Sequence, residues 1–374
     1  MPTTLQILSA KHLLWFGGIL LVIGSGATLA VSDEETDSSG QTRTQSGHLI
    51  KDPAKVMGAE SCKECHKSEH AAWSASKHAT NYERIDSSSG KKIAEAYGST
   101  KVCLNCHSTP HTENAKFAGS VGVSCESCHS PAGGDDGWFK IHSDYGGKDV
   151  KREDETAEHL KERLAKCEAA GMVRAADVGA LAKNCYSCHI IADEKLLAAG
   201  HKTGQSSFDL IPWMQGEVRH NFQVDQSVNA ESPSLLKARF GITTEQRKRK
   251  LLVVGKLIEL ETCLRNLASI EAGNLSESYA GRRGWAGRAE DAYEFLDEEI
   301  GEVVENDQIK AALKAVKKIE LGRKFEDQAG AKAAADHISE IVKSFVEDAD
   351  AEDLAELDKL VNDLDKPVGT PYTP

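Results

Sequence analysis

Hydrophobic positions in the last third of the chain recur with the period of an α-helix. Five apolar residues fall on one helical face: Val253, Leu257, Leu260, Leu264 and Leu267. The same spacing continues over 295–319, with a division near 306–307, and again over 338–345 and 354–361. Four or five amphipathic helices predict a helical bundle domain at residues 232–374. Such a bundle either docks a partner or stabilises the chain, and it contains no catalytic motif.

The pattern at the N-terminus differs, because residues 13–31 form an uncharged stretch that follows Lys11 and His12. It ends in small residues, and an acidic run follows. This is typical of an export signal cleaved after Ala30. Its length also approaches the roughly 17–25 residues of a membrane-spanning helix. We therefore predict a signal peptide or an N-terminal membrane anchor at 1–31 and a periplasmic or otherwise extracytoplasmic location. Residues 32–56, rich in Ser, Thr, Asp and Gly, predict a flexible tether.

Between these parts, the motif Cys-x-x-Cys-His occurs four times. The copies are Cys62/Cys65/His66, Cys103/Cys106/His107, Cys125/Cys128/His129 and Cys185/Cys188/His189. Structural zinc needs four ligands closed around the ion, and a redox dithiol needs no adjacent histidine. A histidine directly after the second cysteine in every copy is typical of covalent haem attachment. We therefore expect four haem c groups, with these four histidines as the proximal iron ligands.

The motifs define a tetrahaem cytochrome c domain at residues 57–231. This region has few large apolar side chains, so porphyrin faces would replace much of the usual core. Without haem we do not expect it to fold. The predicted fold class is mainly α, a multihaem cytochrome c domain with little regular sheet followed by the helical bundle.

The second axial ligand decides what each iron can do. The chain has 4 methionines and 14 histidines, which favours bis-histidine ligation. Three distal candidates, His78, His142 and His201, follow the first, third and fourth motifs at similar intervals, close enough to cap a neighbouring haem. The second motif has no such counterpart. For it the candidates are His220, which leads, then His111 and His70, or no ligand at all.

Several stretches resemble the cytochrome c-554 family, typified by a four-haem carrier that accepts electrons during hydroxylamine oxidation. They are 62–78, which includes Trp73, Ser76 and His78, then 122–129, and Ala199-Gly-His201 followed by Phe208. The resemblance covers about 57–225 and omits the C-terminal helical region. It implies closely stacked haem pairs, three bis-histidine haems and one open iron.

These observations predict an electron carrier between a redox protein donor and acceptor. The alternative is an enzyme that reduces nitric oxide or a related nitrogen species at a five-coordinate second haem. A haem-based sensor with the bundle as output is a weaker third reading. The net charge of −13 argues against a nucleic-acid partner. The donor, the acceptor, the haem potentials and the oligomeric state stay open.

Two further features leave alternatives open. Cys167 and Cys263 could form a disulfide or remain two buried thiols. A basic cluster, Arg282, Arg283 and Arg288 around Trp285, could pair with haem propionates or an acidic partner, or could be a plain surface loop.

Overall fold

The computed structural model describes residues 52–113, 116–118, 121–204, 208–216, 218, 242–270, 284–321, 325–348, 353–364 and 366–369. The predicted leader at 1–31, nearly all of the predicted tether, His220, Arg282 and Arg283 lie outside these residues. Within them, no helix combines the length and apolar character needed to cross a bilayer.

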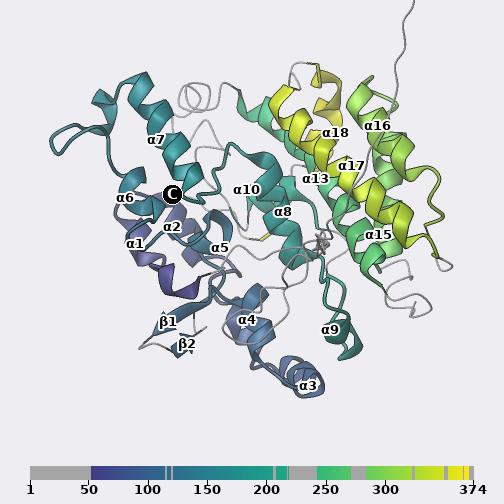
Figure 1. Ribbon diagram of the computed structural model, residues 1–374, viewed down its shortest axis with the longest axis horizontal. Helices are drawn as coiled ribbons and strands as arrows, with labels where there is room; N and C mark the ends of the chain where they lie inside the picture. The colour runs from purple at the N-terminus through teal and green to yellow at the C-terminus, as the bar shows by residue number, and fades with distance from the viewer. Residues whose placement is uncertain are drawn as a thin grey trace, which may run out of the picture. The chain divides into compact units, whose positions relative to one another are not determined.

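Short helices make up most of the motif-bearing region (Figure 1). They are η1 (Pro53–Lys55), α1 (Glu60–Lys63), α2 (Lys67–Ser74), η2 (Asn81–Arg84), α3 (Ser88–Tyr97), α4 (Lys101–His107), α5 (Cys125–His129), α6 (Trp138–His142), η3 (Arg152–Asp154), α7 (Ala157–Ala169), α8 (Val178–His189), α9 (Glu194–Ala198) and α10 (Leu210–Gln215). One hairpin of β1 (His111–Glu113) and β2 (Lys116–Ala118) pairs antiparallel, with His111 opposite Ala118. The mainly α fold with little sheet is as predicted.

The C-terminal part contains longer helices, as the periodicity indicates. They are α13 (Thr244–Ser269), α15 (Trp285–Glu294), the π-helical turn η4 (Phe295–Ile300), α16 (Asp307–Val316), α17 (Gln328–Asp348), η5 (Ala355–Leu357) and α18 (Asp358–Leu364). The break near 306–307 has a local cause. Asn306 is the N-cap of α16, and its side chain accepts hydrogen bonds of 3.0 Å from the backbone N–H groups of Gln308 and Ile309.

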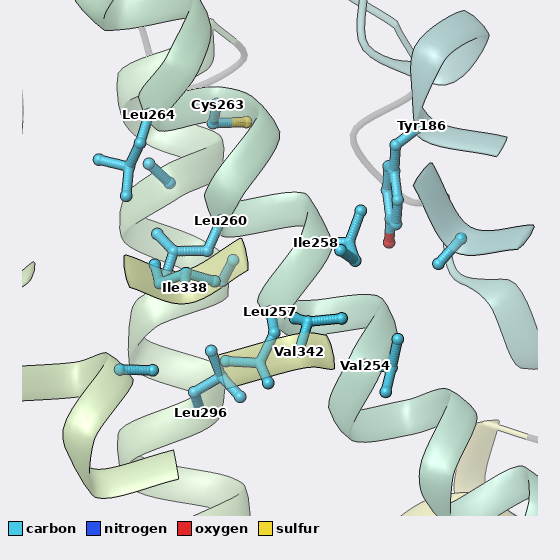
Figure 2. Close-up of a cluster of buried hydrophobic side chains, with 14 of the residues drawn as sticks. Tyr186, Val254, Leu257, Ile258, Leu260, Cys263, Leu264, Leu296, Ile338 and Val342 are labelled. Atoms are coloured by element: carbon cyan, nitrogen blue, oxygen red, sulfur yellow. The ribbon is translucent and has the colours of Figure 1, made fainter. Parts of the chain in front are cut away.

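Helix α13 is buried on more than the one face that its leucine pattern indicates. Leu257 and Leu260 are fully buried, and so are Val254 and Ile258 on another face. In Figure 2, Ile258 points toward Tyr186 of α8. Helix α13 is therefore a buried central helix and not an amphipathic surface helix. Helices α15 and α17 pack against it, and so do α8 and α10.

One hydrophobic cluster therefore runs from Val178 of α8 to Val361 of α18 and includes residues on both sides of the predicted 231/232 boundary. A second, small cluster lies under α6 and α7 and contains Ala132, Trp138 and Cys167. The domain boundary itself stays a prediction. The fourth motif, on α8, is part of the larger core.

Candidate functional site

Each Cys-x-x-Cys-His motif lies at or beside a helix end. The second, third and fourth motifs finish α4, α5 and α8, so that His107, His129 and His189 are the last residues of their helices. In the first motif, α1 ends inside the motif and His66 is the N-cap of α2. Residues three apart in a helix share a face. The two thiols of a helical motif therefore point the same way, with the histidine beyond them.

The first motif is less enclosed than the other three. Cys65 is exposed, whereas each of the other seven motif cysteines is partly buried. The cause is local, because α1 ends at Lys63 and leaves Cys65 and the exposed His66 outside a helix. Cys65 is therefore more open to solvent than the other motif cysteines. Its role as a haem anchor stays a prediction that rests on the motif alone.

Three of the motif histidines face a second histidine from a distant segment. The ring centres of His66 and His142 are 6.1 Å apart and those rings are nearly parallel, at 17°. Those of His78 and His189 are 6.2 Å apart. The third pair, His107 and His201, is also separated by 6.2 Å.

These separations fit an iron between the rings. A metal–imidazole bond is about 2.0–2.1 Å long. With ring bonds of about 1.33 Å, the bonded nitrogen lies about 1.1 Å from the ring centre. Two imidazoles on opposite sides of one metal then have centres about 6.2–6.4 Å apart. The three histidine pairs thus have the spacing of axial ligand pairs, and they would hold the haems of the first, fourth and second motifs.

The pairing differs from the expectation for the second motif. His201 faces His107, so the histidine that follows the fourth motif lies at the second one. His142 follows the third motif in the sequence but faces His66 of the first motif. His78 follows the first motif but faces His189 of the fourth. Intervals along the chain identified these three residues without identifying their partners. His220, the leading candidate for the second motif, is outside the described residues.

Backbone carbonyls orient the rings of one further motif histidine, His129, and of the paired His201. The Nδ1 atom of His129 lies 2.7 Å from the carbonyl oxygen of Val173, and that of His201 lies 2.7 Å from the carbonyl oxygen of Lys202. A ring that donates through Nδ1 keeps Nε2 as the acceptor nitrogen available to a metal. The same arrangement is usual for histidine ligands of metals.

Contacts between motifs give their order in space. The side chains of Cys62 and Cys125 lie close enough for each to shift the pKa of the other, which brings the first motif beside the third. Asn184 Nδ2 donates to the Ser127 carbonyl oxygen at 2.8 Å and connects the third to the fourth. Cys106 and Cys188 are in thiol contact and connect the fourth to the second. The motifs therefore adjoin in the order first, third, fourth, second.

The fourth motif opens into a largely apolar cavity with an empty volume of about 810 Å³, which includes space open to solvent. Its lining includes both histidines of the pair, His78 and His189, and the thiols Cys185 and Cys188. This composition suits an apolar cofactor with a few polar anchors. The walls also contain Leu181, Leu210, Met214 and Val218.

Two aromatic residues fix the ring of His189 in that cavity. Phe208 stacks on it with ring centres 3.9 Å apart and 15° between the planes, and Trp213 lies at 5.1 Å. The indole N–H of Trp213 is buried and has no acceptor among the described residues. A haem propionate is one group that could accept from it. Trp213 belongs to no motif, so no pattern in the sequence indicates it.

Burial keeps three of the paired histidines neutral. Desolvation lowers the pKa of His142 and of His189 to about 4, and it also lowers the pKa of His107. Neutral imidazole is the form that binds a metal. Burial raises the pKa of the Cys128 thiol to about 12 and also raises that of Cys185. These thiols are therefore protonated at neutral pH.

Two other histidines of the motif-bearing region lie beside carboxylates. His70 is buried, with Nε2 3.0 Å from a Glu60 oxygen. His159 lies 2.7 Å from Glu155 through its Nδ1 atom. Across the described residues, no three His, Cys, Asp or Glu side chains gather as they do around a bare metal ion.

The two cysteines outside the motifs do not meet. Cys167 belongs to the small cluster under α7 and Cys263 to the large core on α13. Both are free, fully buried thiols. The structure therefore favours the second alternative, two buried thiols, over a disulfide.

The basic cluster is also not a surface loop where it is described. Trp285 and Arg288 lie on α15, and their side chains are almost completely buried. Arg288 pairs with Glu259 of α13 at 2.6 Å. The sequence did not predict this buried ion pair, because Arg288 stands among other arginines and Glu259 lies on a different helix.

Residues 61–130 match the family described as cytochrome c554 and c-prime. The match includes the first three motifs and supports a c-type cytochrome, which implies covalently bound haem c. No curated protein and no solved structure matches the chain.

Proposed function

We propose that this protein is an exported tetrahaem c-type cytochrome that carries electrons between a redox protein donor and acceptor. The observation that carries the proposal is the set of three histidine pairs, each spaced for two ligands on one iron. Haem c supplies a one-electron iron couple when bound. Iron with two histidine ligands has no position free for a substrate, which suits electron transfer.

The fourth pair follows by elimination. His66, His107 and His189 already face His142, His201 and His78. Of the four distal candidates, His220 is the one not yet assigned to an iron, and the iron of His129 is the one not yet assigned a distal histidine. We therefore assign His220 to the iron of His129 rather than to that of His107.

The order of the motifs suits a path for electrons. Neighbouring motifs adjoin through direct contacts, first to third, third to fourth and fourth to second. The first and second sites would then be the ends of the path, where the donor and the acceptor meet the protein. The exposure of Cys65 suits such an end, because a haem attached there lies close to solvent. An extracytoplasmic location, with or without a membrane anchor at 1–31, provides the compartment in which haem c is attached.

The enzyme alternative required an open iron at the second motif. The ring of His201 opposite His107 disfavours it there. No observation favours nitrogen chemistry at another site.

Intact mass and electron paramagnetic resonance (EPR) of the oxidised protein test the proposal. We expect the mass of four haems and low-spin signals only. Each Cys-to-Ser pair, such as Cys103→Ser with Cys106→Ser, should remove one haem. A high-spin ferric signal that changes on adding nitric oxide would instead support the enzyme. Fewer than four haems in the mature wild-type protein would overturn the tetrahaem assignment.

A further inference from the structure

Two buried Arg–Glu pairs each bind the main chain of a paired histidine. Arg288 Nη1 donates to the carbonyl oxygen of His189 at 3.0 Å. Arg163 Nη1 donates to the carbonyl oxygen of His142 at 2.7 Å. The same contact thus recurs at two sites on helices from different parts of the chain, α15 and α7.

The carboxylate of each pair is equally buried. Arg288 Nε and Nη2 donate to one Glu259 oxygen at 3.0 and 2.6 Å, and the side chains are 1% and 6% exposed. Arg163 Nε and Nη2 donate to the two oxygens of Glu155, both at 2.6 Å, with 6% and 4% exposed. A planar guanidinium that binds a carboxylate and a carbonyl together has a fixed orientation.

Further contacts enclose the His189 carbonyl. A Cβ atom on Gly204 would lie 2.0 Å from that oxygen and 3.0 Å from Arg288 Nη1. Two residues on, the indole N–H of Trp285 donates to the carbonyl oxygen of Ile191 at 2.9 Å. Helix α15 therefore holds the chain at and just after the proximal histidine.

Neighbouring charges surround each pair. Lys256 Nζ lies 3.5 Å from Glu259 and 3.0 Å from Asp209, so the group around the fourth motif is balanced overall. Around the first site, His159 Nδ1 lies 2.7 Å from Glu155, and the Arg163 guanidinium lies over the ring of Tyr145 at 5.0 Å. Because these groups are shielded from water, removing one charge leaves its partner uncompensated, and a nearby iron is strongly affected.

We propose that Arg163–Glu155 and Arg288–Glu259 are positioning pairs that hold His142 and His189 and separately set the reduction potentials of the first and fourth haems. This inference rests on the proposed haem ligation. It gives the C-terminal helices a defined role, since α13 and α15 supply the whole of one pair.

The sign of each effect follows from the charge left behind. Arg288→Met leaves the anionic Glu259, which favours oxidised iron and lowers the potential. Glu259→Gln leaves the cationic Arg288 and raises it. The potential of the double variant, Arg288→Met with Glu259→Gln, should fall between those of the two single variants. Because the double variant leaves no uncompensated buried charge, we expect it to fold even if a single variant does not.

An EPR-monitored redox titration of the four-haem protein is the test. Assignment comes from His142→Ala and His78→Ala, which should turn the first and the fourth haem high-spin. In Arg288→Met we expect at least a tenfold change in the oxidised-to-reduced ratio of the fourth haem at fixed potential, about 59 mV for one electron. The first haem should not change. Arg163→Met is the matched control, with the reverse selectivity.

The outcomes separate the two proposals. If the wild-type protein carries no haem at Cys185 and Cys188, both fail. If haem is attached but the Arg→Met and Glu→Gln variants shift its potential in the same direction or not at all, only the positioning role is overturned. Equal shifts in all haems would also overturn it, because they would reflect a general loss of packing.

Discussion

The imidazole of His201 lies opposite that of His107, with the ring centres 6.2 Å apart. His201 follows the fourth motif in the sequence, and His107 belongs to the second. At the second motif, where the sequence favoured His220 or no ligand, the structure thus places His201 opposite the motif histidine.

His201→Ala should therefore open the second iron. We expect one of four low-spin ferric signals to be replaced by a high-spin signal, and added imidazole should restore it. His70→Ala is the control, because His70 is a buried histidine that lies beside Glu60 and not opposite another imidazole. Unchanged low-spin spectra in His201→Ala would show that this pairing is wrong.

Gly204→Ala should disturb the fourth site more than backbone strain alone can explain. Gly204 has a φ of 123°, and a Cβ there would meet the His189 carbonyl oxygen at 2.0 Å. Gly171 has a φ of 93° with nothing within 4 Å of its Cβ position, so Gly171→Ala carries only the strain, about 1–2 kcal/mol. Denaturant unfolding should rank Gly204→Ala as clearly the less stable, with altered EPR of the fourth haem. Equal losses would contradict the steric argument.

Leu257→Ala should destabilise the motif-bearing region together with the C-terminal helices. Leu257 is fully buried in the core that joins α13 to α8, so we expect a loss of about 2–5 kcal/mol. Thermal unfolding can be followed by haem absorbance and by far-ultraviolet circular dichroism. Both midpoints should decrease in Leu257→Ala, and the two should coincide. Val303→Ala, at a side chain 44% exposed, should change stability by less than about 0.5 kcal/mol. Two separate transitions would indicate independent domains.

Acid should remove the contribution of the Glu155–Arg163 pair. The Arg163 guanidinium, which hydrogen-bonds to it, lowers the pKa of Glu155 below its ordinary value of 4.5. The stabilisation is therefore fully present above pH 4.5 and is lost as the pH falls through the lower, folded-state pKa. The difference in unfolding free energy between the wild type and Glu155→Gln should shrink over that range. A difference that does not vary with pH would mean that Glu155 is not ionised in the folded protein.

Local patterns predicted the helices well, because the residues that decide a helix lie within a few positions of one another. The break at Asn306 is such a case. The burial of α13 on a second face was not predictable, since it depends on Tyr186 and its neighbours, far away in the sequence. Likewise the motifs predict the proximal histidines, and the intervals that follow the motifs suggested the distal candidates. Which histidine lies opposite which motif depends on how distant segments pack together, and spacing within one segment carries no information about that.

The exposure of Cys65 was not predictable for the same reason. Its motif has the same spacing as the other three, yet the other motif cysteines are partly buried. Burial depends on which distant segments pack over a motif, and the motif itself carries no signal for that.

The crossed histidine pairs also bear on how the molecule matures. The spans from His66 to His142, from His78 to His189 and from His107 to His201 overlap one another. Each iron would thus act as a crosslink that closes a long loop and restricts the unfolded chain, much as a disulfide does. If the chain is exported N-terminus first, as proposed, none of these loops can close until His142 has crossed the membrane. Haem attachment at the early motifs would therefore precede the final ligation, and each such haem would wait with a single protein ligand.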